Sequence, residues 1–220
     1  MRKINKVNWE KFKDLASKLI KFKTEISRVP VRAESWEEVI YAVLLYMEHE
    51  AVWEPTSHAK GSDIEVNLNG DTLRISAKGG KVTAEDQKLI MSSYRLTRFR
   101  DLEEMLDFLD KNAKEIDLYL ICAREERRKD IKYHVFKIDS HALVPDEMLK
   151  SSNWEEDGQA WNFPENIIKG IGARIVKKMS NQLWYTISLT YTPLNPLVEV
   201  CISKKDIGTA LIDILKSLDK

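Results

Sequence analysis

Apolar residues recur at helical spacing near the N-terminus. The stripe consists of Trp9, Phe12, Leu15, Leu19 and Ile20, with lysine and glutamate between them. A stripe of this period is typical of a helix that buries one face, so we predict a helix over residues 9–26. Pro30 cannot continue a helix, because it lacks the backbone N–H, and the helix should end before it.

A second apolar stripe predicts a helix that begins near Ser35. Its members are Trp36, Val39, Ile40, Val43, Leu44 and Met47. Ser35 is a suitable N-cap, and Glu38 follows three residues later, which is the spacing of a capping box.

The rest of the chain contains both helical and strand patterns. We predict helix from Thr83 to about Leu109, as two helices broken near Thr97, and a last helix over 206–218. Apolar or alternating runs predict strands at 117–123, 131–138, 174–179, 183–191 and 197–202, with a charged turn at 124–130 and a loop-rich segment at 151–164. We therefore expect an α/β (α+β) fold with a mixed central β-sheet flanked by helices.

A β-hairpin is predicted around Asn69-Gly70, the strongest two-residue turn signal. If these residues form the loop, the numbers of two paired residues add up to 139, and Asp63 lies opposite Ser76. Lys78 is two residues beyond Ser76 and points to the same face. The turn therefore predicts that three polar side chains meet in one patch.

A carboxylate beside a lysine on neighbouring strands suits phosphodiester cleavage. The carboxylate can bind Mg²⁺, which polarises a phosphoryl oxygen and lowers the pKa of a bound water. The lysine can orient or deprotonate that water. Gly79 and Gly80 follow directly and allow another backbone or a phosphate to approach closely. The alternative is a solvated hairpin with a surface ion pair.

Composition narrows the class of protein. The 220 residues are 43% apolar and 32% charged, which fits one globular domain over 1–220. Cys122 and Cys201 lie in apolar runs, which fits a reducing cytoplasm, and residues 1–13 lack the apolar core of a signal peptide. We expect no membrane span. The 35 basic residues balance 35 acidic ones, which argues against a generally basic nucleic-acid binder and leaves a local basic surface open.

The residues around the hairpin resemble a known nuclease superfamily. A helix bearing acids at 36–45 precedes Gly61-Ser-Asp-Ile64, and Leu73-Arg-Ile-Ser-Ala-Lys78 follows on the second strand. This arrangement is similar to the PD-(D/E)XK nucleases, and within them to type II restriction endonucleases. The resemblance implies a restriction-endonuclease-like fold, with the catalytic helix and hairpin in 35–80. The remaining sheet, the DNA-contact elements and the dimerisation elements would lie in 81–220.

The same resemblance implies an activity and partners. We expect a Mg²⁺-dependent homodimer that cuts double-stranded DNA at a short GC-only palindrome, CGCG, with a cognate DNA methyltransferase in the same system. Water would attack the phosphodiester directly and leave a 5′-phosphate. The resemblance implies that Asp63 and the backbone carbonyl of Ala77 bind the metal and that Lys78 orients the attacking water.

One position departs from the superfamily pattern, because Ser76 stands where the second acid is usual. A helix glutamate is then expected to complete the metal site. Glu37 and Glu48 share a helix face but are about 16 Å apart along the axis, so both cannot bind one metal. The superfamily pattern favours Glu37, and nearness to the hairpin in sequence favours Glu48. Glu85 and Asp86 remain further candidates.

A basic and polar stretch follows the hairpin and suggests where DNA is contacted. Residues 92–100 carry three arginines and no acid. Arginine can bond a guanine edge with two hydrogen bonds, and serine or lysine can hold phosphates. The candidates are His58, Lys60, Lys81, Ser92, Ser93, Arg95 and Arg98. The alternative is a solvated basic helix edge.

Three other functions remain open at this point. One is a repair or junction-resolving nuclease of the same fold, and another is a non-catalytic DNA-binding module, for which Ser76 is the argument. The third is a protein-interaction domain without a nucleic-acid role. The Gly-x-Gly at 170–172 fits a plain turn before a strand better than a phosphate-binding helical hairpin.

Overall fold

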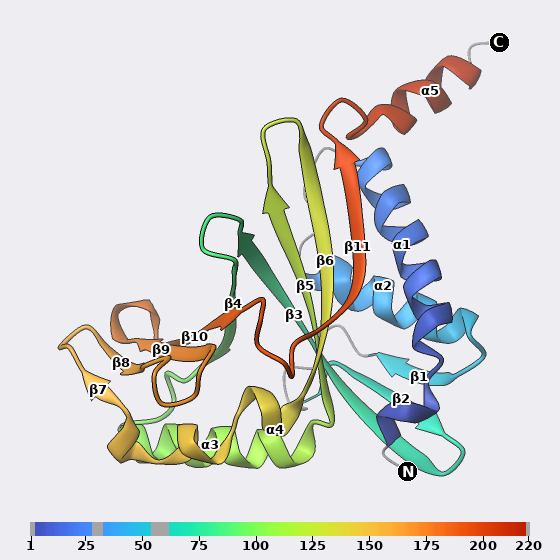
Figure 1. Ribbon diagram of the computed structural model, residues 1–220. Coiled ribbons are helices and arrows are strands. Elements are labelled where there is room, and N and C mark those ends of the chain that lie inside the picture. The colour runs from blue at the N-terminus through green and yellow to red at the C-terminus, as the bar shows by residue number, and fades with distance from the viewer. Residues whose placement is uncertain (1–2, 28–32, 54–61, 219–220) are drawn as a thin grey trace.

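The computed structural model describes residues 3–27, 33–53 and 62–218 (Figure 1). The helices are α1 (Trp9–Ile26), α2 (Ala33–Tyr46), α3 (Leu102–Glu115), α4 (Ser140–Leu143) and α5 (Thr209–Leu218), with short 3-10 turns η1 (Lys3–Lys6), η2 (Asp146–Leu149), η3 (Ser151–Asn153) and η4 (Lys177–Met179). The strands are β1 (Glu50–Trp53), β2 (Ile64–Leu68), β3 (Asp71–Thr83), β4 (Lys88–Arg95), β5 (Leu118–Glu126), β6 (Asp130–Asp139), β7 (Glu155–Glu156), β8 (Ala160–Phe163), β9 (Ile171–Val176), β10 (Gln182–Ser188) and β11 (Asn195–Ser203).

The described strands join in one mixed sheet of eleven strands. Its main order is β11-β6-β5-β3-β4-β10-β9-β8-β7, and β1 and β2 branch from β3. β3 and β5 run parallel, with α3 between them in the chain, whereas the other pairs are antiparallel. The expected mixed α/β fold with a central sheet and flanking helices is confirmed at this level.

The long strand β3 organises the sheet because three strands pair with different parts of it. β5 pairs with residues 75–81 along one edge. On the other edge, β2 pairs with residues 71–75 and β4 with residues 80–83. Residues 76–79 therefore lie in a gap between β2 and β4, at the middle of the sheet.

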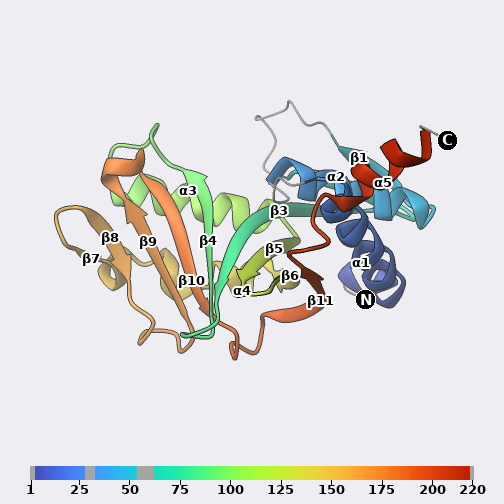
Figure 2. The same cartoon turned by 90° about the horizontal axis from the view of Figure 1, so that it is seen from above.

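Two hydrophobic cores lie on opposite faces of the sheet, because strand side chains alternate. On β5, Leu118 and Leu120 belong to core A, which α1 and α2 cover, whereas Tyr119 and Ile121 belong to core B, which α3 and α4 cover. Seen from above, α1 and α2 lie at one end of the molecule and the β7–β10 strands at the other (Figure 2). Each face therefore buries a separate helix layer.

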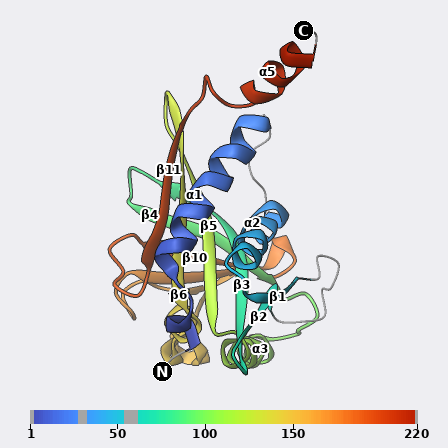
Figure 3. The ribbon, with the colours of Figure 1, turned by 90° about the vertical axis from the view of Figure 1, so that its right-hand side faces the viewer.

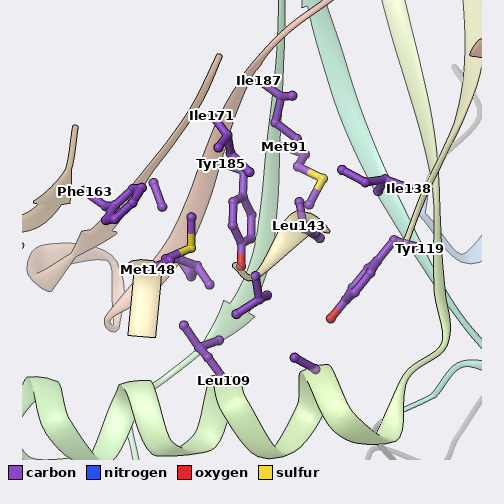
Figure 4. Close-up of a cluster of buried hydrophobic side chains, with 14 of the residues drawn as sticks. Met91, Leu109, Tyr119, Ile138, Leu143, Met148, Phe163, Ile171, Tyr185 and Ile187 are labelled. Atoms are coloured by element: carbon purple, nitrogen blue, oxygen red, sulfur yellow. The ribbon is translucent and has the colours of Figure 1, made fainter. Parts of the chain in front are cut away.

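Core B is filled by large side chains from strands and helices that are distant in sequence. Met91, Tyr185 and Ile187 come from β4 and β10, and Leu109 comes from α3 (Figure 4). Tyr185 is fully buried, which raises the pKa of its phenol. The packing of these side chains fixes the place of α3 below the sheet.

Several predicted elements are confirmed. α1 spans the predicted residues 9–26, with Asn8 as its N-cap. The hairpin forms at Asn69-Gly70, where both residues have positive φ and Leu68 pairs with Asp71. Gly170, also at positive φ, ends a turn before β9, as the plain-turn interpretation predicted.

The helix predicted from residue 83 is wrong in its first half. β3 continues to Thr83, and residues 88–95 form β4 instead of helix. Thr83 Oγ1 donates to the carbonyl of Lys88 at 3.2 Å, which closes the turn between the two strands rather than capping a helix. The second half is correct in kind, because α3 occupies Leu102–Glu115.

Ser35 is not the N-cap of the second helix, because α2 begins at Ala33 and Ser35 lies within its first turn. The Glu38 carboxylate pairs instead with the Lys23 ammonium of α1. This pair joins the two helices that cover core A, which lie next to each other in Figure 3.

No helix in the described part of the chain is long and apolar enough to cross a bilayer. The last helix, α5, lies beyond the end of α1 (Figures 1 and 3). The residue before it, Gly208, donates a hydrogen bond from its amide to the Thr24 carbonyl of α1, 3.1 Å long.

Candidate functional site

Three donors converge on one oxygen of Asp63. Ser76 Oγ lies 2.8 Å from Asp63 Oδ2, the Ala77 amide nitrogen 2.7 Å, and Lys78 Nζ 3.2 Å. The hydrogen bonds that described residues donate to this carboxylate go to Oδ2. The three residues that the hairpin register brought together are therefore in direct contact.

The hairpin places Asp63 in the gap along the edge of β3. The Asp63 amide donates to the carbonyl of Ile75 at 3.0 Å, one step beyond the last β2 pair, Ile64 with Ile75. Its carboxylate then takes the Ala77 amide, which has no partner strand on that edge. The N–H and C=O of a strand residue point to the same side, so the Ala77 carbonyl also faces the gap.

The site combines a buried serine with two charged side chains that are partly exposed to solvent. Ser76 is fully buried, whereas the Lys78 and Asp63 side chains are 16% and 26% exposed. Partial burial strengthens the attraction between the two charges compared with a surface pair. The two charged groups can therefore contact a ligand, while the buried Ser76 holds Asp63 in place.

Two tyrosines form the wall beside Lys78. Its ammonium lies 5.6 Å from the ring centroid of Tyr94, and the hydroxyl of Tyr94 is 2.8 Å from that of Tyr119. Burial raises the pKa of Tyr94 to about 12, and the charges of Asp63 and Glu115 add to the rise. Burial also raises the pKa of Tyr119. Both phenols therefore stay neutral near pH 7.

A helix glutamate was expected as the third partner of Asp63, and the hydrogen bonds to Asp63 from described residues come from Ser76, Ala77 and Lys78 instead. Glu37 Oε2 accepts from the Trp53 indole at 3.1 Å, and Trp53 pairs with Ile64, so Glu37 lies toward the Asp63 end of the hairpin. The expectation that Glu48 shares a helix face with Glu37 is wrong, because α2 ends at Tyr46 and Glu48 follows it at positive φ. Glu48 lines a pocket with Asn67 and Asn69 at the turn end. That end is about 16 Å along β2 from Asp63, since a strand rises about 3.3 Å per residue.

Other acids give the site no cluster of ligands. Among the described residues, no group of three or more His, Cys, Asp or Glu side chains is placed to hold a metal. Glu85 and Asp86 are exposed in the turn between β3 and β4, several residues beyond the gap. Glu115, at the end of α3, is near enough to affect Tyr94 and was not a candidate from the sequence.

The residues predicted to contact DNA occupy different surfaces. Lys81 is exposed but lies an odd number of residues from Lys78, so it points to the opposite face of β3. Ser92 pairs with Trp184, and the Oγ atom of Ser93 is buried. His58 and Lys60 lie outside the described residues.

The sequence predicted that the two candidate arginines lie on one helix, and this prediction is wrong. Arg95 ends β4, where its Nε atom donates to Gln182 Oε1 at 3.3 Å. Arg98 follows in a turn, and its guanidinium lies over the rings of Phe99 and Phe108, 4.8 and 4.7 Å from their centroids. Phe108 also contacts Tyr94 edge-on, so Arg98 is on the same side as Lys78.

Sequence reasoning missed the tyrosines and Gln182. Tyr94 stood in a run interpreted as a helix, and Tyr119 is indistinguishable from other core residues of a buried strand. The hydrophobic alternation of Leu89 and Met91 is the one signal that would have predicted β4 and brought Tyr94 to the sheet.

Comparison of this chain with protein-family models, with curated proteins and with solved structures found no match.

Proposed function

We propose that the protein is a Mg²⁺-dependent endodeoxyribonuclease of the PD-(D/E)XK kind, acting on duplex DNA as a type II restriction enzyme. The observation that carries the proposal is the contact of Asp63 with Ser76, the Ala77 amide and Lys78. It supports the resemblance because the hairpin brings the matching residues into one patch.

The arrangement of elements supports the same proposal. The acid-bearing helix α2 packs against the hairpin that carries Asp63 and Lys78, on the core A face, whereas the side chains of Asp63 and Lys78 project from the other face. The hairpin belongs to a mixed sheet with helices on both faces, which is consistent with the proposed restriction-endonuclease-like fold.

The oxygen atoms of the site fit a magnesium ion in kind. Mg²⁺ is commonly held by one or two carboxylates, with waters and substrate phosphates filling the other positions. Asp63 offers Oδ1, since its described donors reach Oδ2, and the Ala77 carbonyl faces the same gap. A bound Mg²⁺ would polarise the phosphoryl oxygen and lower the pKa of a bound water.

The residues of the chain have separate roles in this proposal. Lys78 orients the attacking water and offsets negative charge that develops on the phosphate. Asp63 holds the ammonium of Lys78 and presents its second oxygen to the ion. Ser76 cannot reach solvent, so it supports Asp63 from below rather than acting as a ligand.

The test is incubation of the wild-type protein with plasmid DNA and Mg²⁺, followed by sequencing of the ends. We expect discrete fragments, with ends that report the recognised bases and the 5′-phosphate. Asp63→Asn or Lys78→Gln should lower cleavage at least about a hundredfold, because each removes a charge from the reacting centre. Duplex binding in Ca²⁺, measured by fluorescence anisotropy, should change little.

The matched control is Asp71→Asn, which changes a carboxylate at the turn of the same hairpin. Asp71 is exposed, and Lys6 lowers its pKa. This variant should cut like the wild type. Full activity of Asp63→Asn would show that the site assignment is wrong.

A second function is favoured by one observation, which is that no group of three or more metal-ligating side chains exists among the described residues. That arrangement suits a DNA-binding module without catalysis. Such a protein would shift duplex DNA in a gel and leave it uncut with Mg²⁺, Mn²⁺ or Co²⁺. Failure to shift duplex at low salt would exclude both functions.

A further inference from the structure

An irregularity in β4 lies next to the candidate site. Trp184 of β10 pairs with Ser92, but Gln182 pairs with Arg95, so two residues of β4 stand opposite one residue of β10. Such a β-bulge inserts an extra residue, bends the strand and re-aims the side chains near it. Here the affected residues are Ser93 and Tyr94.

The side chain of Gln182 holds this bulge in place. Its amide Nε2 donates to the carbonyls of Tyr94 and Ser93 at 3.1 and 3.3 Å, and its Oε1 accepts from Arg95. Gln182 is 8% exposed, so these hydrogen bonds are largely shielded from water. Backbone groups left over by the register shift are thereby satisfied, and the bulge becomes a fixed feature.

The bulge turns Tyr94 toward α3, where it is held on three sides. Phe108 packs edge-on against its ring, with centroids 5.4 Å apart and an interplanar angle of 89°. The Tyr94 hydroxyl is hydrogen-bonded to that of the fully buried Tyr119. The remaining ring face carries the ammonium of Lys78.

We infer that Tyr94 is a positioning residue for Lys78. The ring face attracts the ammonium through its quadrupole, and the bulge, Phe108 and Tyr119 keep that face still. Lys78 is thus confined between the Tyr94 ring and Asp63 Oδ2. A lysine has four rotatable side-chain bonds, so this confinement supplies an orientation that the hairpin alone does not.

The proposal rests on the proposed nuclease function for its effect on rate, but the contact itself can be tested without activity. Protein labelled with ¹³C at the lysine ε-carbon gives one NMR signal for each lysine, and Lys78→Arg identifies that of Lys78. A proton above an aromatic face is shifted upfield by the ring current. We expect this shift in the wild type and in Tyr94→Phe, and its loss in Tyr94→Leu.

The kinetic arm separates the ring from the hydroxyl. In Tyr94→Leu we expect kcat to fall about tenfold with KM unchanged, because substrate contacts stay while Lys78 loses its orientation. Tyr94→Phe keeps the ring and should recover most of kcat. A purely structural role of the hydroxyl would predict that both variants are impaired alike, since each leaves the Tyr119 hydroxyl buried without its partner.

The outcomes are distinct. An upfield Lys78 signal that persists in Tyr94→Leu overturns the inference, as does a Tyr94→Phe variant that is as impaired as Tyr94→Leu while both give wild-type circular dichroism. If Tyr94→Leu does not fold, Phe108→Leu replaces it, because it loosens the Tyr94 ring from behind and should weaken the same shift. If wild-type protein cuts no DNA, the proposed function fails, and the NMR signal alone decides the role of Tyr94.

Discussion

At the scale of single residues, the hairpin register predicted the core of the candidate site. Asn69-Gly70 permits only a short loop, so the pairing of Asp63 with Ser76 followed from the sequence and was confirmed by their contact. The roles of these residues stay predictions. The register does not predict how deeply a residue is buried. Ser76 is fully buried on the face of β3 that core B covers, and core B is formed by residues distant in sequence.

Burial of Ser76 leads to a prediction about stability. Ser76→Ala removes a shielded hydrogen bond to a carboxylate, so the free energy of unfolding should fall by about 1–2 kcal/mol in metal-free buffer. Urea denaturation followed by tryptophan fluorescence measures the change. Ser62→Ala is the matched control, because Ser62 bonds a partly exposed carboxylate, that of Glu65, at 3.3 Å.

The control should lose less than about 0.5 kcal/mol. If Ser76 also served as a metal ligand, Ser76→Ala would in addition lower the affinity for Mg²⁺, measured by calorimetric titration. The comparison thus separates support of Asp63 from direct metal binding.

At the scale of elements, local patterns predicted α1 and the hairpin but not β4. Lys88, Leu89 and Met91 favour helix by intrinsic propensity, and a threonine before an acidic pair resembles a helix start. Pairing with β3 and β10 overrides this preference, because it buries Leu89 and Met91 in core B. Gly80 allows that pairing: a Cβ there would lie 2.9 Å from Leu89 Cδ1 and 3.1 Å from the Ile90 carbonyl oxygen.

Far from the candidate site, a charged network joins β5, β6 and β11. It makes the free energy of unfolding depend on pH in the acid range. Arg127 Nε donates to Glu125 at 2.7 Å, and His134 Nε2 lies 3.0 Å from the same carboxylate. The Arg127 hydrogen bond, followed by that from His134, lowers the pKa of Glu125, and Lys132 likewise lowers the pKa of Glu199.

Carboxyls whose pKa is lower in the folded state stabilise it above their unfolded pKa, near 4.5, and lose this effect as pH falls through the folded pKa. Glu125→Gln should cost about 2 kcal/mol near pH 7, since a buried charged hydrogen bond is lost. Its stability should also fall less steeply below pH 4.5 than that of the wild type. Urea midpoints measured across this range test both effects.

The control for this prediction is Glu126→Gln, an exposed change on the same strand, which should follow the wild-type curve. Parallel acid curves for Glu125→Gln and wild type would show that the network contributes nothing to acid sensitivity. The network lies outside the candidate site, so DNA cleavage at neutral pH should survive in either variant.

At the scale of the whole molecule, zero net charge does not tell on which face of the sheet the basic residues lie. Lys78 and Arg98 are linked through Tyr94 and Phe108 on the side of core B, whereas Lys81 lies on the opposite face of β3. The sequence grouped these residues in one basic stretch. It could not separate them, because the separation depends on residues 78–83 forming a strand and on α3 packing beneath it.

This separation predicts which basic residues meet DNA when the duplex lies over Lys78. Binding that neutralises phosphates releases counterions, so the logarithm of the affinity falls linearly with that of the salt concentration, by about 0.9 per phosphate contact. Arg98→Ala should make this slope smaller by about 0.9, the value of one phosphate contact. The reason is that Phe99 and Phe108 hold its guanidinium on the Lys78 side. Lys81→Ala should leave the slope unchanged.

Fluorescence anisotropy of a labelled duplex in Ca²⁺, measured over a series of KCl concentrations, gives both slopes. Repeating the titration with a scrambled duplex tells whether Arg98 reads a base or contacts a phosphate, because a lost base contact relaxes discrimination without changing the slope. A slope that falls for Lys81→Ala and not for Arg98→Ala would place the DNA on the α1/α2 face. Lys78 and Asp63 would then be on the wrong side of the sheet to cut it, and the proposed function would fail with them.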